Sequence, residues 1–132
     1  SHTGDIIMNR QLKISRISQD FSGLLGNLSD YAVSHGFDES LFKAILRKLD
    51  FSRKQFEKDI SDFSDGQKKK VMIAASLCTP AHLYIWDEPL NYLDVYSRRQ
   101  LEDLIISCKP SMLIVEHDKT FCEAVNAQYC KF

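Results

Sequence analysis

Two polar segments of the sequence follow directly after apolar runs. Asp87 and Glu88 follow the run 83–86, and His117 lies just after the run 112–115. Ligands of open parallel sheets bind outside the carboxyl ends of the strands, so these side chains converge on one edge if the two runs are neighbouring strands. Adjacent carboxylates on an extended segment point to opposite sides, so one can hold a metal ion while the other orients a water, as in phosphoryl transfer. The competing interpretation is that strand-end acids are only solvated or cap the next helix.

A second candidate site lies at residues 64–67, with the sequence Ser-Asp-Gly-Gln. A hydroxyl and a flexible glycine directly before a helix bring backbone N–H groups and the positive helix end together, which favours an anion. An ordinary serine N-cap would give the same pattern. The three lysines at 68–70 oppose the helix dipole in the first turn, and we expect them to be mainly solvated.

A parallel sheet is needed to position these groups. Leu83–Trp86 and Met112–Val115 are uninterrupted apolar runs of strand length, and the pattern over Val95–Cys108 is helical. Two strands joined by a helix form a βαβ unit, and continuous hydrophobicity predicts a sheet buried on both faces. With two more short strands expected within residues 5–18, namely 6–8 and 12–17, the predicted class is α/β.

Helical periodicity dominates residues 21–62, which predicts a helical region between the segments that contain strands. Shorter helices are expected over Gly26–His35 and Arg53–Lys58, and Asp38 is expected to cap a longer one. The apolar face of that longer helix would consist of Leu41, Ala44, Ile45 and Leu49. A further helix would begin after Gly66 and carry an inward stripe of Val71, Ala74, Ala75 and Cys78.

The composition is that of an ordinary soluble domain. The 132 residues contain 17 Lys+Arg and 18 Asp+Glu, for a net charge of −1. This balance argues against a domain that binds nucleic acid on its own, which would normally carry an excess of basic residues. The 44% of hydrophobic residues excludes a disordered tail, and no apolar run approaches the roughly 20 residues that span a bilayer. We therefore expect a cytosolic protein or a soluble piece of a larger one. The four cysteines lack metal-site spacing and are expected to be small core thiols.

In their order along the chain, these segments resemble the motifs of the ATP-binding cassette family. Residues 64–67 are similar to the signature loop, with Asp65 in place of its first glycine. Residues 83–88 resemble the Walker B strand with its following glutamate, and residues 91–94 resemble the D-loop. Gln19 and His117 stand where the Q-loop glutamine and the switch histidine belong. The resemblance implies a P-loop NTPase core with a mostly parallel sheet and a helical subdomain.

The resemblance narrows to the ABC-F group, twin-cassette proteins that act on the ribosome, and within it to the second cassette of an antibiotic-resistance (ribosome-protection) protein. The pairing of Asp-Glu-Pro-x-Asn-x-x-Asp with Glu-His-Asp carries this similarity. Leu90 and Glu116 depart from it, because Thr is common at the first position and Ser or Thr at the second. Two alternatives stay open: the nucleotide-binding subunit of a membrane transporter, and a domain that keeps the fold for protein contacts alone.

The resemblance also implies roles for individual residues. Glu88 would polarise the attacking water, and His117 would contact the γ-phosphate of ATP. Asp87 and Gln19 would organise Mg²⁺ through waters. The Ser64 hydroxyl and the Gly66 N–H would bind, in trans, the γ-phosphate held by a second cassette. The resemblance also assigns Gln67 and Asp94 to nucleotide binding, and Asp94 would help to join the two cassettes.

No Gly-x-x-x-x-Gly-Lys-Ser/Thr sequence, the Walker A loop that cradles phosphates, occurs in the chain. The resemblance would place it upstream of Asp5, so we expect a truncated cassette. It would comprise core strands and the Q-loop (1–20), the helical subdomain (21–62) and the remaining ATPase core (63–132). We expect such a fragment to be inactive alone. Its unpaired sheet edge near Met112–Val115 is expected to lead to self-association, strand exchange or partial disorder.

Overall fold

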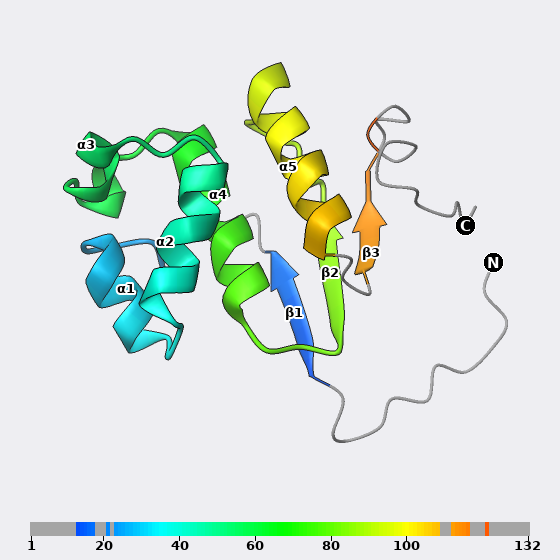
Figure 1. Cartoon of the computed structure of the whole chain (residues 1–132), viewed down its shortest axis with the longest axis horizontal. Coiled ribbons are helices and arrows are strands. Elements are labelled where there is room, and N and C mark those ends of the chain that lie inside the picture. The colour runs from blue at the N-terminus through cyan, green and yellow to red at the C-terminus, as the bar shows by residue number, and fades with distance from the viewer. Residues whose placement is uncertain (1–12, 18–20, 22, 109–111, 117–120, 122–132) are drawn as a thin grey trace, which may run out of the picture.

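A run of helices separates the first strand from the other two in the computed structural model, which describes residues 13–17, 21, 23–108, 112–116 and 121 (Figure 1). Their order is β1 (Ile14–Ile17), α1 (Leu28–Ser34), α2 (Glu39–Lys48), α3 (Arg53–Phe56), a 3-10 turn (Ile60–Asp62), α4 (Asp65–Cys78), β2 (Leu83–Asp87), α5 (Val95–Cys108) and β3 (Met112–Val115). The predicted α/β class is confirmed. The strand expected at 6–8 lies outside the described residues, and the division at residues 20 and 62 stays a prediction.

The three strands form a parallel sheet in the order β1-β2-β3. Ile17 is in register with Trp86, and Asp87 is in register with Val115. The carboxyl ends of all three strands therefore reach the same edge of the sheet. The chain crosses from β2 to β3 through α5, as the βαβ prediction requires.

One face of the sheet packs against helices. Tyr84 and Trp86 of β2 belong to the apolar core or pack on it, together with Leu101 and Leu104 of α5. On the opposite face Arg16 is exposed and Ile85, its register partner, is only half-buried. The prediction that both faces are buried is therefore wrong within the described residues, because the helices of that part of the chain cover a single face.

A buried hydrogen-bond network fixes α4 to the sheet. The Ser15 hydroxyl of β1 donates to the Ser76 carbonyl oxygen at 2.9 Å, and the two hydroxyls lie 2.7 Å apart. The indole Nε1–H of Trp86 donates to the Ser76 hydroxyl at 2.9 Å. Polar atoms that are buried need such partners. One serine of α4 thus connects two neighbouring strands to the same point of the helix.

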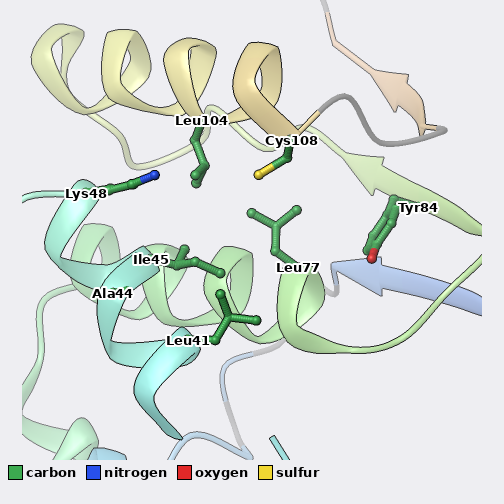
Figure 2. Close-up of a pocket in the computed structure, with 8 residues that line it drawn as sticks. All are labelled: Leu41, Ala44, Ile45, Lys48, Leu77, Tyr84, Leu104 and Cys108. Atoms are coloured by element: carbon green, nitrogen blue, oxygen red, sulfur yellow. The ribbon is translucent and has the colours of Figure 1, made fainter. Parts of the chain in front are cut away.

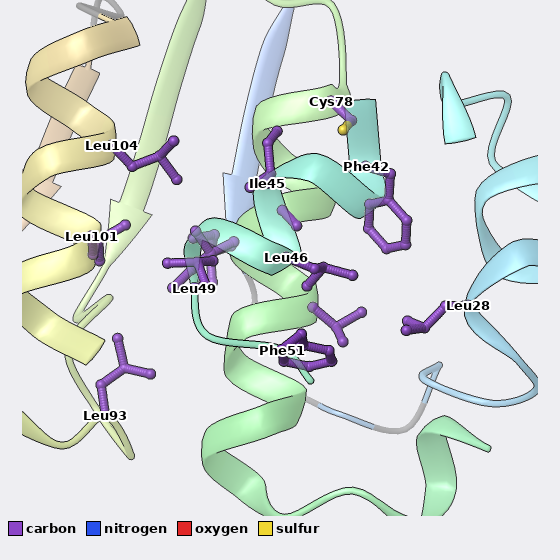
Figure 3. Packing of buried hydrophobic residues seen from close by; sticks show 14 of the residues in the cluster. Leu28, Phe42, Ile45, Leu46, Leu49, Phe51, Cys78, Leu93, Leu101 and Leu104 are labelled. Carbon is purple, nitrogen blue, oxygen red and sulfur yellow. The ribbon is translucent and has the colours of Figure 1, made fainter. Parts of the chain in front are cut away.

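The helical region packs around α2, as Figure 3 shows for the core leucines and phenylalanines. Asp38 caps α2 as predicted, since its Oδ1 accepts from the N–H groups of Ser40 and Leu41. The buried face is rotated from the predicted one, because Leu41 is 48% exposed whereas Phe42 is fully buried. Phe42 stacks on Tyr31 with ring centroids 5.9 Å apart, and its larger apolar area decides which side of α2 faces inward.

The cysteine prediction holds at one of the two thiols that the structure describes. Cys78, at the end of α4, is buried, and burial raises the pKa of its thiol to about 11. Cys108, at the end of α5, is exposed, so its assignment to the core is wrong. Cys108 lies at the last position of its helix, where it lines the apolar cavity described below and is open to solvent. Cys122 and Cys130 lie outside the described residues.

Candidate functional site

The carboxyl edge of the sheet brings the predicted acidic residues together. Asp87 ends β2 and is exposed, while Glu88 and Glu116, which follow β2 and β3, are half-buried. β2 and β3 are parallel neighbours, which is the condition under which Asp87, Glu88 and His117 were expected to share one edge. Gln19 and His117 lie outside the described residues, so their predicted roles remain predictions.

Glu88 is held in an unusual backbone conformation by its own turn. Its φ is 47°, in the left-handed region that costs a residue with a side chain about 1–3 kcal/mol unless the surroundings fix it. The Asn91 side-chain amide donates to Glu88 Oε2 at 2.9 Å, and the Asn91 backbone N–H donates to the Glu88 carbonyl oxygen at 3.2 Å. Asn91 therefore orients the Glu88 carboxylate, a role that the sequence motif alone did not reveal.

Glu116 connects this turn to the neighbouring strand. Its Oε2 accepts from the backbone N–H of Leu90 at 3.4 Å, a long hydrogen bond that joins the end of β3 to the segment after β2. Sequence reasoning treated Glu116 only as a departure from a motif. The signal that could have indicated its role is its position, since it directly follows the strand beside β2.

Ser64 caps α4 in the way that the simpler interpretation predicted. Its hydroxyl accepts from the Gln67 N–H at 3.2 Å, and Gln67 Oε1 accepts from the Ser64 N–H at 2.9 Å. This capping box engages the Gln67 side chain within its own helix turn. The N–H groups of Asp65 and Gly66, at the first two helical positions, have no partner within an α-helix and are the ones that an incoming anion could use.

The segment after β2 folds directly onto the start of α4. A Cβ built on Gly66 would lie 2.7 Å from the backbone oxygen of Tyr92, a distance that a methyl group cannot occupy. Tyr92 has a φ of 70°, and its ring lies 5.7 Å, centroid to centroid, from that of Phe21. Gly66 is therefore required by close backbone packing, in addition to any flexibility it provides.

This contact forms one wall of a cleft of about 480 Å³. Four residues that the resemblance assigned to nucleotide binding line the cleft: Ser64, Gly66, Gln67 and Asp94. Asp87 and Glu88 do not line it. The structure thus groups the predicted residues into two sites, one at the sheet edge and one at the start of α4.

Asp94 has a structural function in this cleft. Its Oδ1 accepts from the Ser97 N–H at 2.7 Å in the first turn of α5, and hydrogen bonding to Ser97 lowers the pKa of its carboxyl group. Lys70 lines the same cleft, and its charge also favours the ionised form of Asp94. Burial lowers the pKa of Lys70, and Asp94 and Asp50 oppose that shift.

The lysines of the first turns of α4 are less exposed than predicted. Lys68 and Lys70 are half-buried, and Lys69 is only 1% exposed. The expectation of solvated lysines is wrong for Lys69 because this position faces the sheet, which the sequence of the helix alone does not indicate.

A separate apolar cavity of about 290 Å³ lies between α2, α4, β2 and α5 (Figure 2). Leu77 and Cys108, at the C-terminal ends of α4 and α5, are among the residues that line it. The cavity is therefore at the opposite end of α4 from Ser64, and none of the predicted site residues lines it.

The acidic edge fits a magnesium ion that is only partly coordinated by protein. Within the described residues, no three His, Cys, Asp or Glu side chains are arranged to hold a metal ion. Mg²⁺ commonly keeps several waters and takes one or two carboxylates together with substrate phosphates. The exposed carboxylate of Asp87 at the end of β2 suits that arrangement.

No helix of the described part of the chain is long and apolar enough to cross a membrane.

Comparisons with curated proteins find similar sequences in bacteria. The chain is 33% identical over 137 residues to the ATP-binding protein Uup of Buchnera aphidicola, covering 98% of this chain and 23% of the relative. It is 32% identical over 111 residues to the uncharacterized ABC transporter ATP-binding protein YkpA of Bacillus subtilis, covering 82% and 21%. It is 33% identical over 93 residues to the ribosome protection protein VmlR of Bacillus subtilis, covering 66% and 17%. The chain thus spans about a fifth of the length of these relatives.

Solved structures show the same fold. The RNase-L Inhibitor structure matches with a TM-score of 0.69 and 25% identity, covering 92% of this chain and 25% of that one. A structure of ribosome-bound archaeal Pelota and ABCE1 matches with a TM-score of 0.73 and 22% identity, covering 87% and 20%. The family model described as "ABC transporter" matches residues 3–91, which is more than half of the chain. The chain therefore belongs to the ABC transporter family of ATP-binding cassettes.

Proposed function

We propose that the protein carrying this chain binds and hydrolyses ATP, and that it is an ABC-F protein that acts on the ribosome. The observation that carries the catalytic part is the edge of the sheet, where Asn91 orients the half-buried Glu88 directly beside the exposed Asp87. Two adjacent carboxylates in different surroundings can take different roles, one toward a metal ion and the other toward a water.

In this proposal Glu88 orients the attacking water and accepts its proton, while His117 contacts the γ-phosphate. Asp87 and Gln19 hold Mg²⁺ through waters, and the ion supplies charge neutralisation for the phosphates. The Ser64 hydroxyl and the Gly66 N–H bind the γ-phosphate held by a second cassette. Catalysis then depends on two cassettes closing on shared nucleotides.

The cleft at the start of α4 supports this division of roles. The four residues that the resemblance assigned to nucleotide binding share it, and Asp87 and Glu88 lie outside its lining. A cleft that is separate from the acidic edge is suited to receive a phosphate carried by another cassette. Gln67 and Asp94 would support this surface from the capping box and from the first turn of α5.

The ribosomal part rests on the chain's relatives. One is named a ribosome protection protein, and one structural neighbour is described as bound to a ribosome. A protein of this kind works in the cytoplasm, where ribosomes are, and the ribosome-protection branch confers antibiotic resistance. Because the sequence contains no Walker A motif, we propose that the 132-residue chain alone does not hydrolyse ATP.

The test is Glu88→Gln in the intact protein. The amide cannot accept the proton of the attacking water, so we expect ATP turnover to fall at least about 100-fold while ATP still binds. The variant should accumulate in an ATP-bound state with two cassettes closed, which cross-linking between them would detect. Glu57→Gln, at an exposed position after α3, is the matched control and should turn over ATP like the wild type.

The same variant tests the ribosomal partner. With ATP and Mg²⁺, the Glu88→Gln protein should co-sediment with ribosomes, whereas the wild type should be released as it hydrolyses ATP. Undiminished turnover would refute the role of Glu88. A trapped protein that stays with membranes and not with ribosomes would instead identify a transporter subunit.

A further inference from the structure

Lys69 is a buried cation of α4. It is 1% exposed, although it lies in the second turn of a helix whose N-terminus is at the surface. It precedes Ser76 by seven residues, or about two turns, so both side chains lie on the same side of α4. Ser76 contacts Ser15 and Trp86, so Lys69 faces the sheet as well.

The direction of α4 places Lys69 near the carboxyl edge of that sheet, on the face that α4 covers. The first turn of α4 contacts Tyr92, in the segment after β2, and its last residue leads through residues 79–82 into the start of β2. The helix therefore runs opposite to the strands. Lys69 lies toward the helix end that meets the carboxyl ends of the strands, whereas Ser76 lies level with their middle.

Three carboxylates attract the Lys69 ammonium: Asp87, Glu88 and Glu116. Burial lowers the pKa of Lys69, and these three charges oppose that shift. Glu116 is the residue directly after β3 and continues the alternation of Met112 and Ile114, which pack on the same core as the buried face of α4. Lys69 and Glu116 thus belong to the same side of the sheet.

Each charge explains why the other is tolerated. An ammonium removed from water is costly unless opposite charge lies nearby, and carboxylates gathered at one edge repel each other unless a cation lies nearby. Glu116 also accepts from the Leu90 N–H, and Leu90 lies within the turn that Glu88 and Asn91 close. The Lys69 charge can therefore influence the position of that turn indirectly, by attracting the Glu116 carboxylate that accepts from Leu90.

We infer that Lys69 is a positioning residue of the acidic edge: its buried charge helps to keep Glu116 on Leu90 and so to fix the turn that presents Glu88. Its consequence for catalysis rests on the proposed ATPase function. Its coupling to Glu116 does not, since that coupling belongs to the fold.

The structural test is a double-mutant cycle in the intact protein, with Lys69→Met, Glu116→Gln and the double variant. Hydrogen exchange measured by mass spectrometry on a peptide covering residues 87–94 reports the turn locally. We expect each single substitution to speed exchange there about tenfold, and the double variant to exchange no faster than the Lys69→Met variant. Lys68→Met, at the half-buried neighbouring lysine, is the matched control and should leave exchange unchanged.

Exchange in a peptide from α2 shows whether each variant is folded. Lys69→Arg keeps the charge, so its exchange rate over residues 87–94 should stay closer to that of the wild type than the rate of Lys69→Met does. If the increases in exchange rate caused by the two single substitutions multiply in the double variant, the two residues are not coupled and the inference is overturned. The kinetic readout is separate: Lys69→Met should lower kcat for ATP and leave KM unchanged, and an unchanged kcat would overturn the positioning role. A wild-type protein without ATPase activity would refute the proposed function and leave the exchange result standing.

Discussion

Gly66 shows how a single residue can satisfy a motif for a reason other than the expected one. The sequence predicts a flexible glycine at an anion site, and the structure adds that a Cβ there would lie 2.7 Å from the Tyr92 carbonyl oxygen. That obstacle is backbone, which cannot rotate away as a side chain would. The contact involves residues that are distant along the chain, so no local pattern could have predicted it.

Gly66→Ala should therefore lower the free energy of unfolding of the cassette by about 1–3 kcal/mol, the usual cost of forcing a methylene into a packed site. Urea unfolding measures it as a lower midpoint at constant slope. Gly23→Ala is the control, because a Cβ at Gly23 meets nothing within 4 Å, and it should change stability by no more than about 0.5 kcal/mol. Equal midpoints for the two variants would contradict the steric role of Gly66.

Asp94 makes the stability of the cassette depend on pH. Hydrogen bonding to Ser97 lowers its pKa in the folded state, so its contribution is present above the unfolded value of about 3.9 and is lost as pH falls through the folded value. Asparagine caps helices without titrating. Asp94→Asn should thus match the wild type at neutral pH and lose less stability below about pH 4.

Asp94→Ala provides the comparison, because it removes the acceptor at every pH and should cost about 1 kcal/mol at neutral pH. Urea midpoints measured at several pH values would separate the three proteins. If the Asn variant lost stability in acid as steeply as the wild type, the pH dependence would have to come from other carboxyl groups.

At the scale of elements, one hydroxyl of α4, that of Ser76, hydrogen-bonds to residues of two strands of the sheet. In a Ser76→Ala variant the buried Trp86 indole N–H loses its acceptor, while Ser15 can still donate to the backbone carbonyl of residue 76. A buried donor without a partner costs about 1–3 kcal/mol. We expect a loss of stability of that size, measured by urea unfolding.

Ser107→Ala is the matched control, since the Ser107 hydroxyl donates at 3.3 Å to the Leu104 carbonyl oxygen of its own helix. It should change stability by no more than about 0.5 kcal/mol. A Ser76→Ala variant as stable as this control would mean that the Trp86 indole finds another acceptor and that the network does not hold α4 in place.

The elements divide into those that local patterns predict and those that they do not. Asp38 and Ser64 were predictable as N-caps because capping depends on residues within one turn. The inward side of α2 was not, because Leu41 and Phe42 are both apolar and tertiary contacts, such as that of Phe42 with the Tyr31 ring, select between them. Lys69 was mispredicted for the same reason: its surroundings are supplied by strands that follow it in the chain.

At the scale of the whole molecule, the parallel order of the sheet accounts for the acidic part of the predicted site. Once β2 and β3 are neighbours, Asp87, Glu88 and Glu116 must meet at one edge, and the sequence contained that information. The separation of the edge from the cleft at α4 was not predictable, because it depends on how the segment after β2 folds back onto Gly66.

The same sheet order predicts how the 132-residue chain behaves in isolation. Within the described residues β3 pairs with β2 alone, and its sequence Met-Leu-Ile-Val carries no charge that would discourage another strand. The other edge strand, β1, contains the exposed Arg16. We therefore expect this chain to self-associate through β3, with sedimentation velocity showing dimers or larger species whose share grows with concentration.

Leu113→Lys should shift that distribution toward monomer, because residue 113 is at the middle of β3, in register with Ile85, and a lysine there protects an edge from pairing. Leu25→Lys is the control: it adds the same charge at a position that is 65% exposed and far from β3 in the sequence, and it should leave the distribution unchanged. If the wild-type chain is monomeric at all concentrations, or if both lysine variants dissociate it equally, β3 is not the surface through which the copies meet.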